Sequence, residues 1–253
     1  MKARFLGTGT SMGVPVAGKM WSNHLSDDPR NFRNRCSLWL HDDKHSIVID
    51  TGPEFRLQSI QHKIHKIDAV LLTHHHYDHI GGLEDLRSYS YQQDQVNVYC
   101  NALTRTEVEH RCHYLFGENR YVGSAVLKLN TIEPYQKLNI GSLNIESVEI
   151  NHGPIDILGY GISNLYYLTD LKRLPKKTEE RIKGADIVIM SGLRWQQEHP
   201  THQTIEEAII LTQRLNIGKS YLIHMNAQVD HAEVQARLPK NVLLAYDGLE
   251  IEF

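Results

Sequence analysis

The chain has 253 residues, enough for one large domain or two small ones with a sizeable core. Its 27 basic and 30 acidic residues give a formal net charge of −3, without the long basic stripe expected of a large nucleic-acid footprint. No apolar run approaches the roughly 20 residues of a membrane span, the N-terminus has too short an apolar run for a signal peptide, and three widely spaced cysteines do not suggest a disulfide framework. We therefore expect a cytoplasmic protein without membrane association.

The first half of the chain alternates strand patterns with helical patterns. The expected strands are residues 3–6, 37–40, 46–50, 69–72 and 96–100, and the expected helices are residues 54–65, 83–90 and 103–116. The glycine-rich stretch at 7–15 lacks the helix that a dinucleotide-binding fingerprint requires directly behind its glycines. We interpret it as a loop, either with backbone amides facing an anion or as a plain tight turn. An irregular surface segment is expected at 17–35.

The second half is richer in strand patterns. The expected strands are residues 126–129, 138–140, 143–150, 160–163, 165–168, 187–190, 221–223, 242–246 and 249–251, and the expected helices are residues 175–183, 204–215 and 229–238. No Gly/Ser-rich linker divides the chain. Strands lead and helices follow in both halves, which predicts an α/β protein with two sheets packed face to face and helices outside. The expected fold is a four-layer αββα sandwich in one domain, residues 1–253.

A cluster of metal-type side chains ends the strand expected at 69–72. His74, His76, Asp78 and His79 form a His-x-His-x-Asp-His pattern, and active sites of layered α/β folds lie at such strand ends. Imidazole and carboxylate together suit zinc, manganese or iron. A tight turn can aim alternate residues at one point, so we expect His74 and His76 to share one ion and Asp78 and His79 to face a second. A solvated histidine-rich turn is the alternative, which the interleaved aspartate makes less favourable.

Further polar residues follow other expected strands. His152, Asp170 and His224 each come at the end of an apolar strand, where a single such residue is more often a turn or cap residue than a ligand. The occurrence of three such residues, all of them after the histidine-rich motif, favours a metal site. Asp50 ends the strand at 46–50 and is expected to hydrogen-bond a metal-bound imidazole. A plain turn residue before Gly-Pro is the equally open alternative for Asp50.

The motif and the residues that follow it, in this order, resemble the metallo-β-lactamase superfamily of metallohydrolases over nearly the whole chain. The resemblance implies two divalent ions, one held by His74, His76 and His152, the other by Asp78, His79 and His224, with Asp170 bridging them. Two such ions can share a water-derived nucleophile and clamp a phosphoryl group. The bridging aspartate, where the lactamases have cysteine, and His76, where the redox branch has glutamate, favour hydrolysis. Zn²⁺, Mn²⁺ and Fe²⁺ all suit the ligands.

A narrower resemblance is to the phosphoribosyl 1,2-cyclic phosphate phosphodiesterase group. Residues 5–15 (FLGTGTSMGVP), Cys36-Ser37 and residues 246–250 (YDGLE) carry it. It implies a phosphodiesterase acting on small cyclic phosphates or phosphodiesters. His202, just before a helix, is the expected proton donor to the leaving alkoxide, with His199 as a less favoured rival. Asp78 is expected to take part in catalysis together with His202.

The chain departs from that group in one respect. The group binds a structural zinc through a cysteine cluster after Gly-Val-Pro and a histidine past the last metal ligand. Residues 16–35 contain no cysteine here, and Ala227 stands where that histidine is expected. We therefore expect no third zinc, and because this loop borders the site, the resemblance does not fix the identity of the substrate.

Three other functions are weighed against the phosphodiesterase. A tRNA 3′-processing endonuclease would carry a protruding basic or glycine-rich arm, and no such insertion is visible. A glyoxalase II-type thioesterase usually adds a helical C-terminal domain, whereas this chain ends in a strand at 249–251. A non-catalytic metal-binding regulator is disfavoured because every ligand and a candidate acid are present. The sequence leaves the oligomeric state open, with a homodimer as one alternative.

Overall fold

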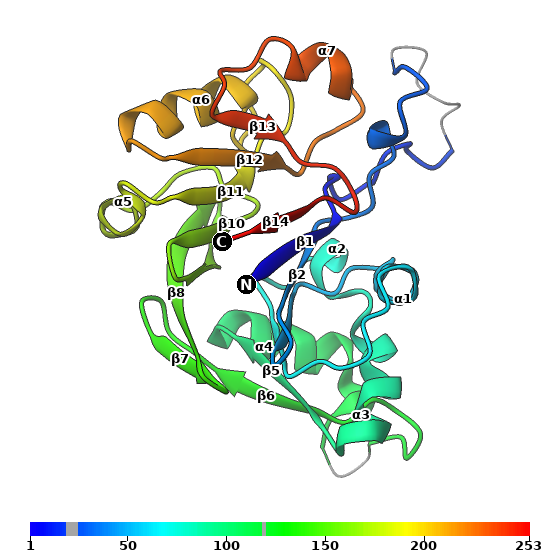
Figure 1. The fold of residues 1–253 in the computed structure, drawn as a ribbon. Coiled ribbons are helices and arrows are strands. Elements are labelled where there is room, and N and C mark those ends of the chain that lie inside the picture. The colour runs from blue at the N-terminus through cyan, green and yellow to red at the C-terminus, as the bar shows by residue number, and fades with distance from the viewer. Residues whose placement is uncertain (19–24, 118–119) are drawn as a thin grey trace.

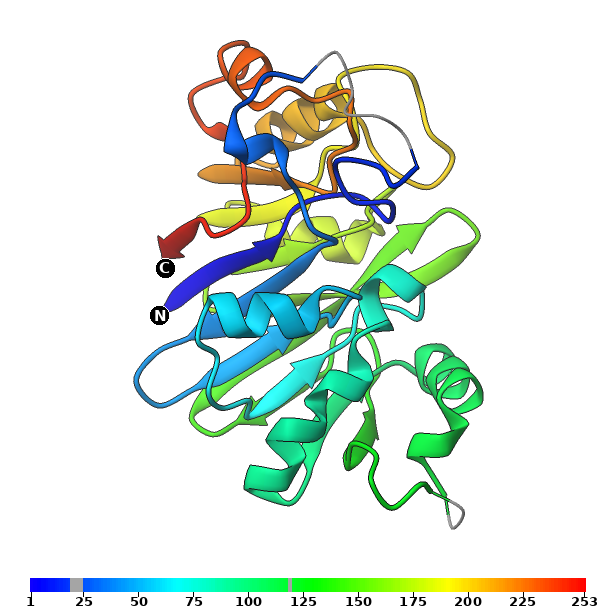
Figure 2. The same ribbon diagram turned by 90° about the vertical axis from the view of Figure 1, so that its right-hand side faces the viewer.

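Two seven-stranded sheets pack face to face in the computed structural model, which describes residues 1–18, 25–117 and 120–253 (Figures 1 and 2). The first sheet has the order β14-β1-β2-β3-β4-β5-β6 and the second β13-β12-β11-β10-β9-β8-β7. The strands of the first sheet are β1 (Lys2–Gly7), β2 (Ser37–His41), β3 (Ser46–Ile49), β4 (Ala69–Leu71), β5 (Val96–Cys100), β6 (Leu127–Thr131) and β14 (Glu250–Glu252). Those of the second are β7 (Lys137–Ile140), β8 (Leu143–His152), β9 (Ile155–Ile162), β10 (Leu165–Leu168), β11 (Ile187–Ser191), β12 (Lys219–Ile223) and β13 (Val242–Leu244).

Helices cover the outer face of each sheet (Figure 1). The helices of the first half are α1 (Phe55–Gln61), α2 (Tyr77–Ile80), α3 (Arg87–Gln93) and α4 (Ala102–Arg111), and those of the second are α5 (Lys176–Ile182), α6 (Ile205–Arg214) and α7 (His231–Gln235). Short 3-10 helices are η1 (Pro29–Asn31), η2 (Leu83–Leu86) and η3 (His113–Leu115). The predicted αββα layering is therefore confirmed. None of the helices in the described part of the chain is long and apolar enough to cross a membrane.

Three apolar layers hold the sandwich together. Successive side chains of a strand point to opposite faces, so Ile47 and Ile49 of β3 enter the layer between the sheets while Val48 enters the layer under the first-half helices. The third layer lies between the second sheet and α5, α6 and α7. Strands buried on both faces explain why the sequence shows continuous apolar runs rather than strict alternation.

Parallel pairing brings the ends of distant strands to one edge. The parallel pairs β3–β4 and β4–β5 lie in the first sheet, and β10–β11 and β11–β12 lie in the second. The residues that follow these strands therefore meet at the same edge of the sandwich, where α2 and the β8–β9 turn also lie (Figure 2).

The structure corrects four local predictions. His152 is the last residue of β8 rather than part of a turn after Ile150, because the hairpin turns only at Gly153-Pro154. The next strand, β9, begins at Ile155 rather than at residue 160. Asp78 and His79 lie on α2 rather than in a tight turn. The helix expected at 229–238 is the shorter α7, capped by Asp230.

The segment expected to be irregular surface at 17–35 is not wholly so. Its residues 19–24 lie outside the described part of the chain, but η1 follows, and Asn31 and Arg33 are buried. Arg33 donates hydrogen bonds to the Asn31 side chain (3.1 Å) and to the Val229 carbonyl (2.8 Å). The polar composition of the segment concealed the contact between Arg33 and Val229, because Val229 lies 196 positions further along the chain.

Candidate metal centre

The strand-end residues expected from the sequence come together as two groups of potential ligands. The first consists of His74, His76 and His152, and the second of Asp78, His79, Asp170 and His224. Within each group the nitrogen and oxygen donors lie within 4.8 Å of one another. All of these side chains are buried except His76, which is half-buried. A third, overlapping group consists of His152, Asp170 and His202, so the division into two sets that the resemblance implied stays a prediction.

Asp170 lies between the two groups and presents one carboxylate oxygen to each. Oδ1 is 3.3 Å from His79 Nε2 and 3.4 Å from His224 Nε2. Oδ2 is 3.7 Å from His152 Nε2 and 3.9 Å from His74 Nε2. These separations suit a carboxylate that offers one oxygen to a cation in each group.

A network behind the groups fixes the orientation of two imidazoles. The carboxylate of Asp50, fully buried after β3, accepts hydrogen bonds from the Thr73 backbone N–H (2.8 Å), the Thr73 hydroxyl (2.8 Å) and His79 Nδ1–H (2.7 Å). Because the Thr73 hydroxyl donates to Asp50, its oxygen accepts from His74 Nδ1–H at 3.0 Å. His74 and His79 therefore present unprotonated Nε2 atoms to the centre in their neutral forms, as metal-bound histidines require.

His152 is oriented in the same way from the other side of the site. Its Nδ1–H donates to the Thr201 carbonyl at 2.9 Å, which leaves the Nε2 lone pair facing Asp170. Other buried polar atoms have no hydrogen-bond partner among the described residues: His79 Nε2, both ring nitrogens of His224 and His202 Nδ1. Buried nitrogens without partners carry a desolvation cost, which a coordinated cation would remove at His79 Nε2 and His224 Nε2. The donor set fits divalent metal ions.

The electrostatics of the centre favour positive charge. Burial alone would lower the pKa of His79, but Asp78, Asp170 and Asp50 surround the ring and raise it well above its usual value. Burial alone would likewise raise the pKa of Asp170, but His224 and His79 hold it well below the usual range. Three carboxylates around one imidazole make a field that attracts a proton, and the same field attracts a divalent cation.

His202 lies beside both ligand groups. Its ring stacks on His224 at a centroid distance of 4.4 Å and lies 4.8 Å from the ring of His152, and Nδ1 is 3.9 Å from Asp170 Oδ2. Burial and the neighbouring His224 lower the pKa of His202 to about 2, so the ring is neutral near pH 7 and has one N–H to donate. His199 lies one ring further out, 5.1 Å from His202, and its Nδ1 accepts a hydrogen bond from Thr201.

Asp50, which the sequence analysis expected to hydrogen-bond an imidazole, does so at His79, but the other residues that orient the ligands were not expected. Thr73 and Thr169 are buried, and Thr169 Oγ1 donates to Asp170 Oδ1 at 2.8 Å. Each threonine directly precedes a predicted ligand, so its position in the sequence was a usable signal. The carbonyl of Thr201 had no such signal, because it meets His152 only through the fold.

Comparison with known proteins agrees with the predicted fold. A family model described as the beta-lactamase superfamily domain matches residues 45–225, and the chain belongs to this superfamily. The fold and the histidine–aspartate clusters define it as a metal-dependent hydrolase. It is similar to a crystal structure of a new diphosphatase from the PhnP family, with 32% identity, a TM-score of 0.92 and coverage of 100% of this chain and 97% of that chain.

Other relatives carry different names. A protein of Porphyromonas gingivalis named octanoyltransferase is 38% identical over 99% of this chain, but the chain spans only 51% of that relative's length. An exodeoxyribonuclease YycJ of Bacillus anthracis is 24% identical over 61% of this chain and 57% of its own length. Zinc-bound PqqB from Methylobacterium extorquens shares the fold, with a TM-score of 0.79 at 19% identity and full coverage of both chains.

Proposed function

We propose that this hydrolase cleaves small phosphodiesters, of the cyclic phosphate or related phosphoester type, with two divalent cations such as Zn²⁺ or Mn²⁺. The observation that carries the proposal is the placement of Asp170, whose two oxygens face separate groups of donors. His74, His76 and His152 would hold one cation and Asp78, His79 and His224 the other, with Asp170 shared. When bound, such cations activate water and neutralise charge on a phosphoryl group.

The protein side chains would supply orientation and a proton. Asp50 and Thr73 hold His74 and His79, and the Thr201 carbonyl holds His152, so the donor atoms need little rearrangement to act. His202 lies beside the shared aspartate, where its N–H can reach the oxygen that leaves phosphorus. An anionic phosphodiester beside the ring would raise the pKa of this histidine, and the imidazolium form, not the neutral ring, would give its proton to the leaving oxygen.

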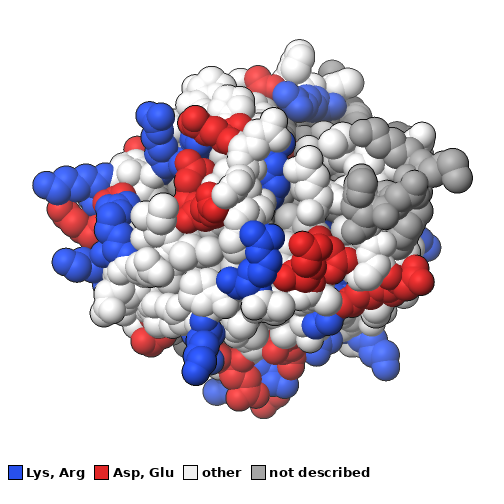
Figure 3. All heavy atoms as spheres, turned by 90° about the horizontal axis from the view of Figure 1, so that it is seen from above, with Lys and Arg blue, Asp and Glu red and all other residues white. Residues whose placement is uncertain are grey.

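A small substrate is favoured over a nucleic acid. The surface seen from above in Figure 3 carries Lys and Arg side chains interspersed with Asp and Glu, without a continuous basic area on that face of the described residues. The similarity to a diphosphatase at 97% coverage of that chain also supports a small phosphorylated substrate.

Thioester hydrolysis is the second candidate. Its support is a set of short matches to hydroxyacylglutathione hydrolases, such as one from Psychromonas ingrahamii that is 40% identical over 24% of this chain and 25% of its own length. The relative named octanoyltransferase also acts, by its name, on an acyl group, although about half of its length lies outside the match.

A hydrolysis panel would test the two candidates. The protein, loaded with Zn²⁺ or Mn²⁺, is offered a cyclic ribose phosphate, a 2′,3′-cyclic nucleotide, a diphosphate diester, an aryl phosphodiester, a phosphomonoester, an acyl thioester and pre-tRNA. Diesters should be cleaved fastest, with two ions per chain by elemental analysis, and Asp170→Asn should lose at least one ion together with activity. Faster cleavage of the thioester or of the monoester would refute the proposal, as would full activity with one ion.

A further inference from the structure

We propose that Lys172 is a positioning residue that holds the loop carrying His202 against the metal centre. The inference rests on the proposed role of His202 and adds a residue that lies outside the ligand set. Lys172 follows Asp170 by two positions, and only 6% of its side chain is exposed. Burial of a lysine to this extent requires charged or polar partners.

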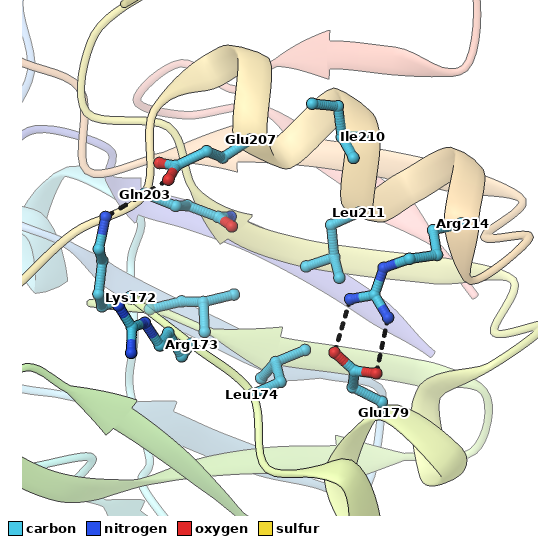
Figure 4. A pocket seen from close by; sticks show the side chains of 10 residues that line it. Lys172, Arg173, Leu174, Glu179, Gln203, Glu207, Ile210, Leu211 and Arg214 are labelled. Carbon is cyan, nitrogen blue, oxygen red and sulfur yellow. Dashed lines mark hydrogen bonds and ion pairs between the residues drawn. The ribbon is translucent and has the colours of Figure 1, made fainter. Parts of the chain in front are cut away.

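Two glutamates surround the Lys172 ammonium group. Nζ lies 3.4 Å from Glu207 Oε1 (Figure 4). It also lies 3.4 Å from Glu198 Oε1. Glu198 belongs to the segment between β11 and α6 that carries His199 and His202, and Glu207 lies in the first turn of α6. The lysine therefore connects the segment after Asp170 to both ends of the short stretch that contains His202.

Glu207 transmits this contact to the residues next to His202. Its Oε2 accepts a hydrogen bond from the Thr204 backbone N–H at 2.7 Å, and the Thr204 hydroxyl accepts from the Glu207 backbone N–H at 3.2 Å. This reciprocal pair is a capping box. One carboxylate thus binds Lys172 through one oxygen and the backbone two positions beyond His202 through the other.

Besides the stacking of its ring on His224, His202 is restrained through its two neighbours in the chain. The Thr201 carbonyl accepts from His152, the Gln203 backbone N–H donates to the Leu171 carbonyl (2.7 Å), and the Gln203 side chain donates to the Ser191 carbonyl (2.8 Å). Leu171, Lys172, Gln203 and Glu207 all line an open pocket of about 350 Å³ behind the metal centre (Figure 4). Gln203 and Thr204 are themselves buried, so the ionic contact of Lys172 would act together with packing and with these hydrogen bonds.

The physical expectation is local loosening without global unfolding. Glu207 and Glu198 are 43% and 77% exposed, so they regain water when the ammonium group is removed and do not become buried unpaired charges. The capping box loses the cation that holds the Glu207 carboxylate in place. Residues 198–204 should therefore open more often, and His202 should spend less time in line with the leaving oxygen.

The test uses the metal-loaded full chain with Lys172→Met, which keeps the length of the side chain and removes its charge. Lys172→Arg keeps the charge, and Lys176→Met is the matched control at an exposed lysine of α5. The first measurement is hydrogen exchange followed by mass spectrometry. Exchange at residues 198–204 should rise at least about fivefold in Lys172→Met and remain near wild type in the other two variants, with residues 69–80 unchanged.

The second measurement is kcat/KM for a cyclic ribose phosphate and for an activated aryl diester. In Lys172→Met, kcat/KM for the cyclic ribose phosphate should fall about tenfold or more, through a lower kcat. For the aryl diester it should fall less than about threefold, because the aryloxide leaves without a proton donor. Lys172→Arg should recover most of the loss.

Unchanged exchange at 198–204 in Lys172→Met would overturn the inference, as would equal losses on the two substrates with the metal content intact. If the wild type cleaves none of the diesters, the proposed function fails, and the exchange measurement alone then decides whether Lys172 holds the loop.

Discussion

Three non-glycine residues of the centre have left-handed backbone conformations. Asp50, Asp170 and His224 have φ angles of 61°, 55° and 58°, and each follows a strand of the sandwich. Such conformations cost of order 1–3 kcal/mol each, and glycine would avoid the cost but would provide no side chain. The left-handed conformation turns each side chain sharply away from the strand direction and into the centre. This placement accounts for the strained backbone at these three positions.

At His202 the expected effect depends on the leaving group. His202→Ala should keep both ions and reduce kcat/KM for a cyclic ribose phosphate by about 10²–10⁴-fold, because the departing alkoxide needs a proton. An aryl diester with a nitrophenolate leaving group should lose far less. Metal content is measured alongside the kinetics. Equal losses on both substrates would indicate a role in substrate binding, and no loss on either would shift the role to His199.

At Asp50 the expected effect is on metal affinity. Asp50→Asn keeps the size of the side chain but weakens the hydrogen bond that holds His79 Nδ1–H and removes a charge near the centre. Loss of such a supporting carboxylate typically reduces metal affinity about 10- to 100-fold. Competition with a chelating indicator gives the affinity, and circular dichroism checks the fold. Wild-type affinity in the variant would show that Asp50 serves only as a turn residue.

At the scale of elements, two glycines allow α2 to lie against the loop after β3. The Thr51 N–H donates to the His79 carbonyl and the Gly82 N–H donates to the Thr51 carbonyl, both at 2.8 Å. A Cβ on Gly52 would lie 2.4 Å from the Asp78 carbonyl oxygen, and one on Gly82 would lie 2.3 Å from the Gly52 carbonyl oxygen. The short helix that carries Asp78 and His79 is thus located by backbone contacts.

Gly52→Ala should displace α2 and disturb the centre from outside the ligand set. Overpacking of this kind costs about 1–3 kcal/mol, and the shift of Asp78 should reduce bound metal in the same variant. Gly184→Ala is the control, since a Cβ there meets nothing within 4 Å and only its positive φ of 75° opposes the change. Thermal unfolding and elemental analysis provide the readouts. A Gly52→Ala protein with full metal content and wild-type stability would contradict the packing argument.

At the scale of the whole molecule, contacts between distant parts of the chain close the sandwich. β1 pairs with β14, and the Thr8 hydroxyl and Asn34 N–H donate to Asp247. Asp230, at the start of α7, accepts hydrogen bonds from Ser26 and Asn31. These contacts join the segment after β1 to the last quarter of the sequence, where a β-bridge also pairs Gly9 with Met225, the residue after His224.

His231 makes this closure sensitive to pH. The side chain is 2% exposed, and burial together with Arg30 and Arg33 lowers its pKa to about 4, although Asp28 and Asp230 oppose the change. The unfolded chain, with a pKa near 6.5, therefore binds more protons between pH 6.5 and 4, and stability falls as the pH falls through this range. The full difference corresponds to about 3 kcal/mol.

His231→Gln should reduce this dependence. Denaturant unfolding at pH 7.5 and at pH 4.5 gives the free energy of unfolding of both proteins, and the wild type should lose more of it than the variant by up to about 3 kcal/mol. At pH 7.5, where the histidine is neutral in both states, the two proteins are compared for any packing effect of the substitution. Equal losses on acidification would show that His231 does not contribute.

The sequence by itself determined the layering of the fold and the residues to consider as ligands. Strand and helix patterns are local, and so is the appearance of His74, Asp170 or His224 directly after an apolar strand. Strands that are buried on both faces have continuous apolar runs, so the sequence predicts them without knowledge of their neighbours. The strand expected at 143–150 stopped two residues short of His152, because Asn151 and His152 are polar and only their pairing with β9 shows that the strand continues.

Only the tertiary structure decided how these residues act on one another. The two oxygens of Asp170, the tautomers held by Thr73 and the Thr201 carbonyl, and the pairing of Lys172 with Glu207 depend on contacts between separate strands and loops. Buried Arg33 looked like a surface residue because its partner carbonyl at Val229 lies at the other end of the chain. Hydrogen bonds and charges act over a few ångströms in space, and local sequence patterns do not encode which distant residues the packed sheets bring within that range.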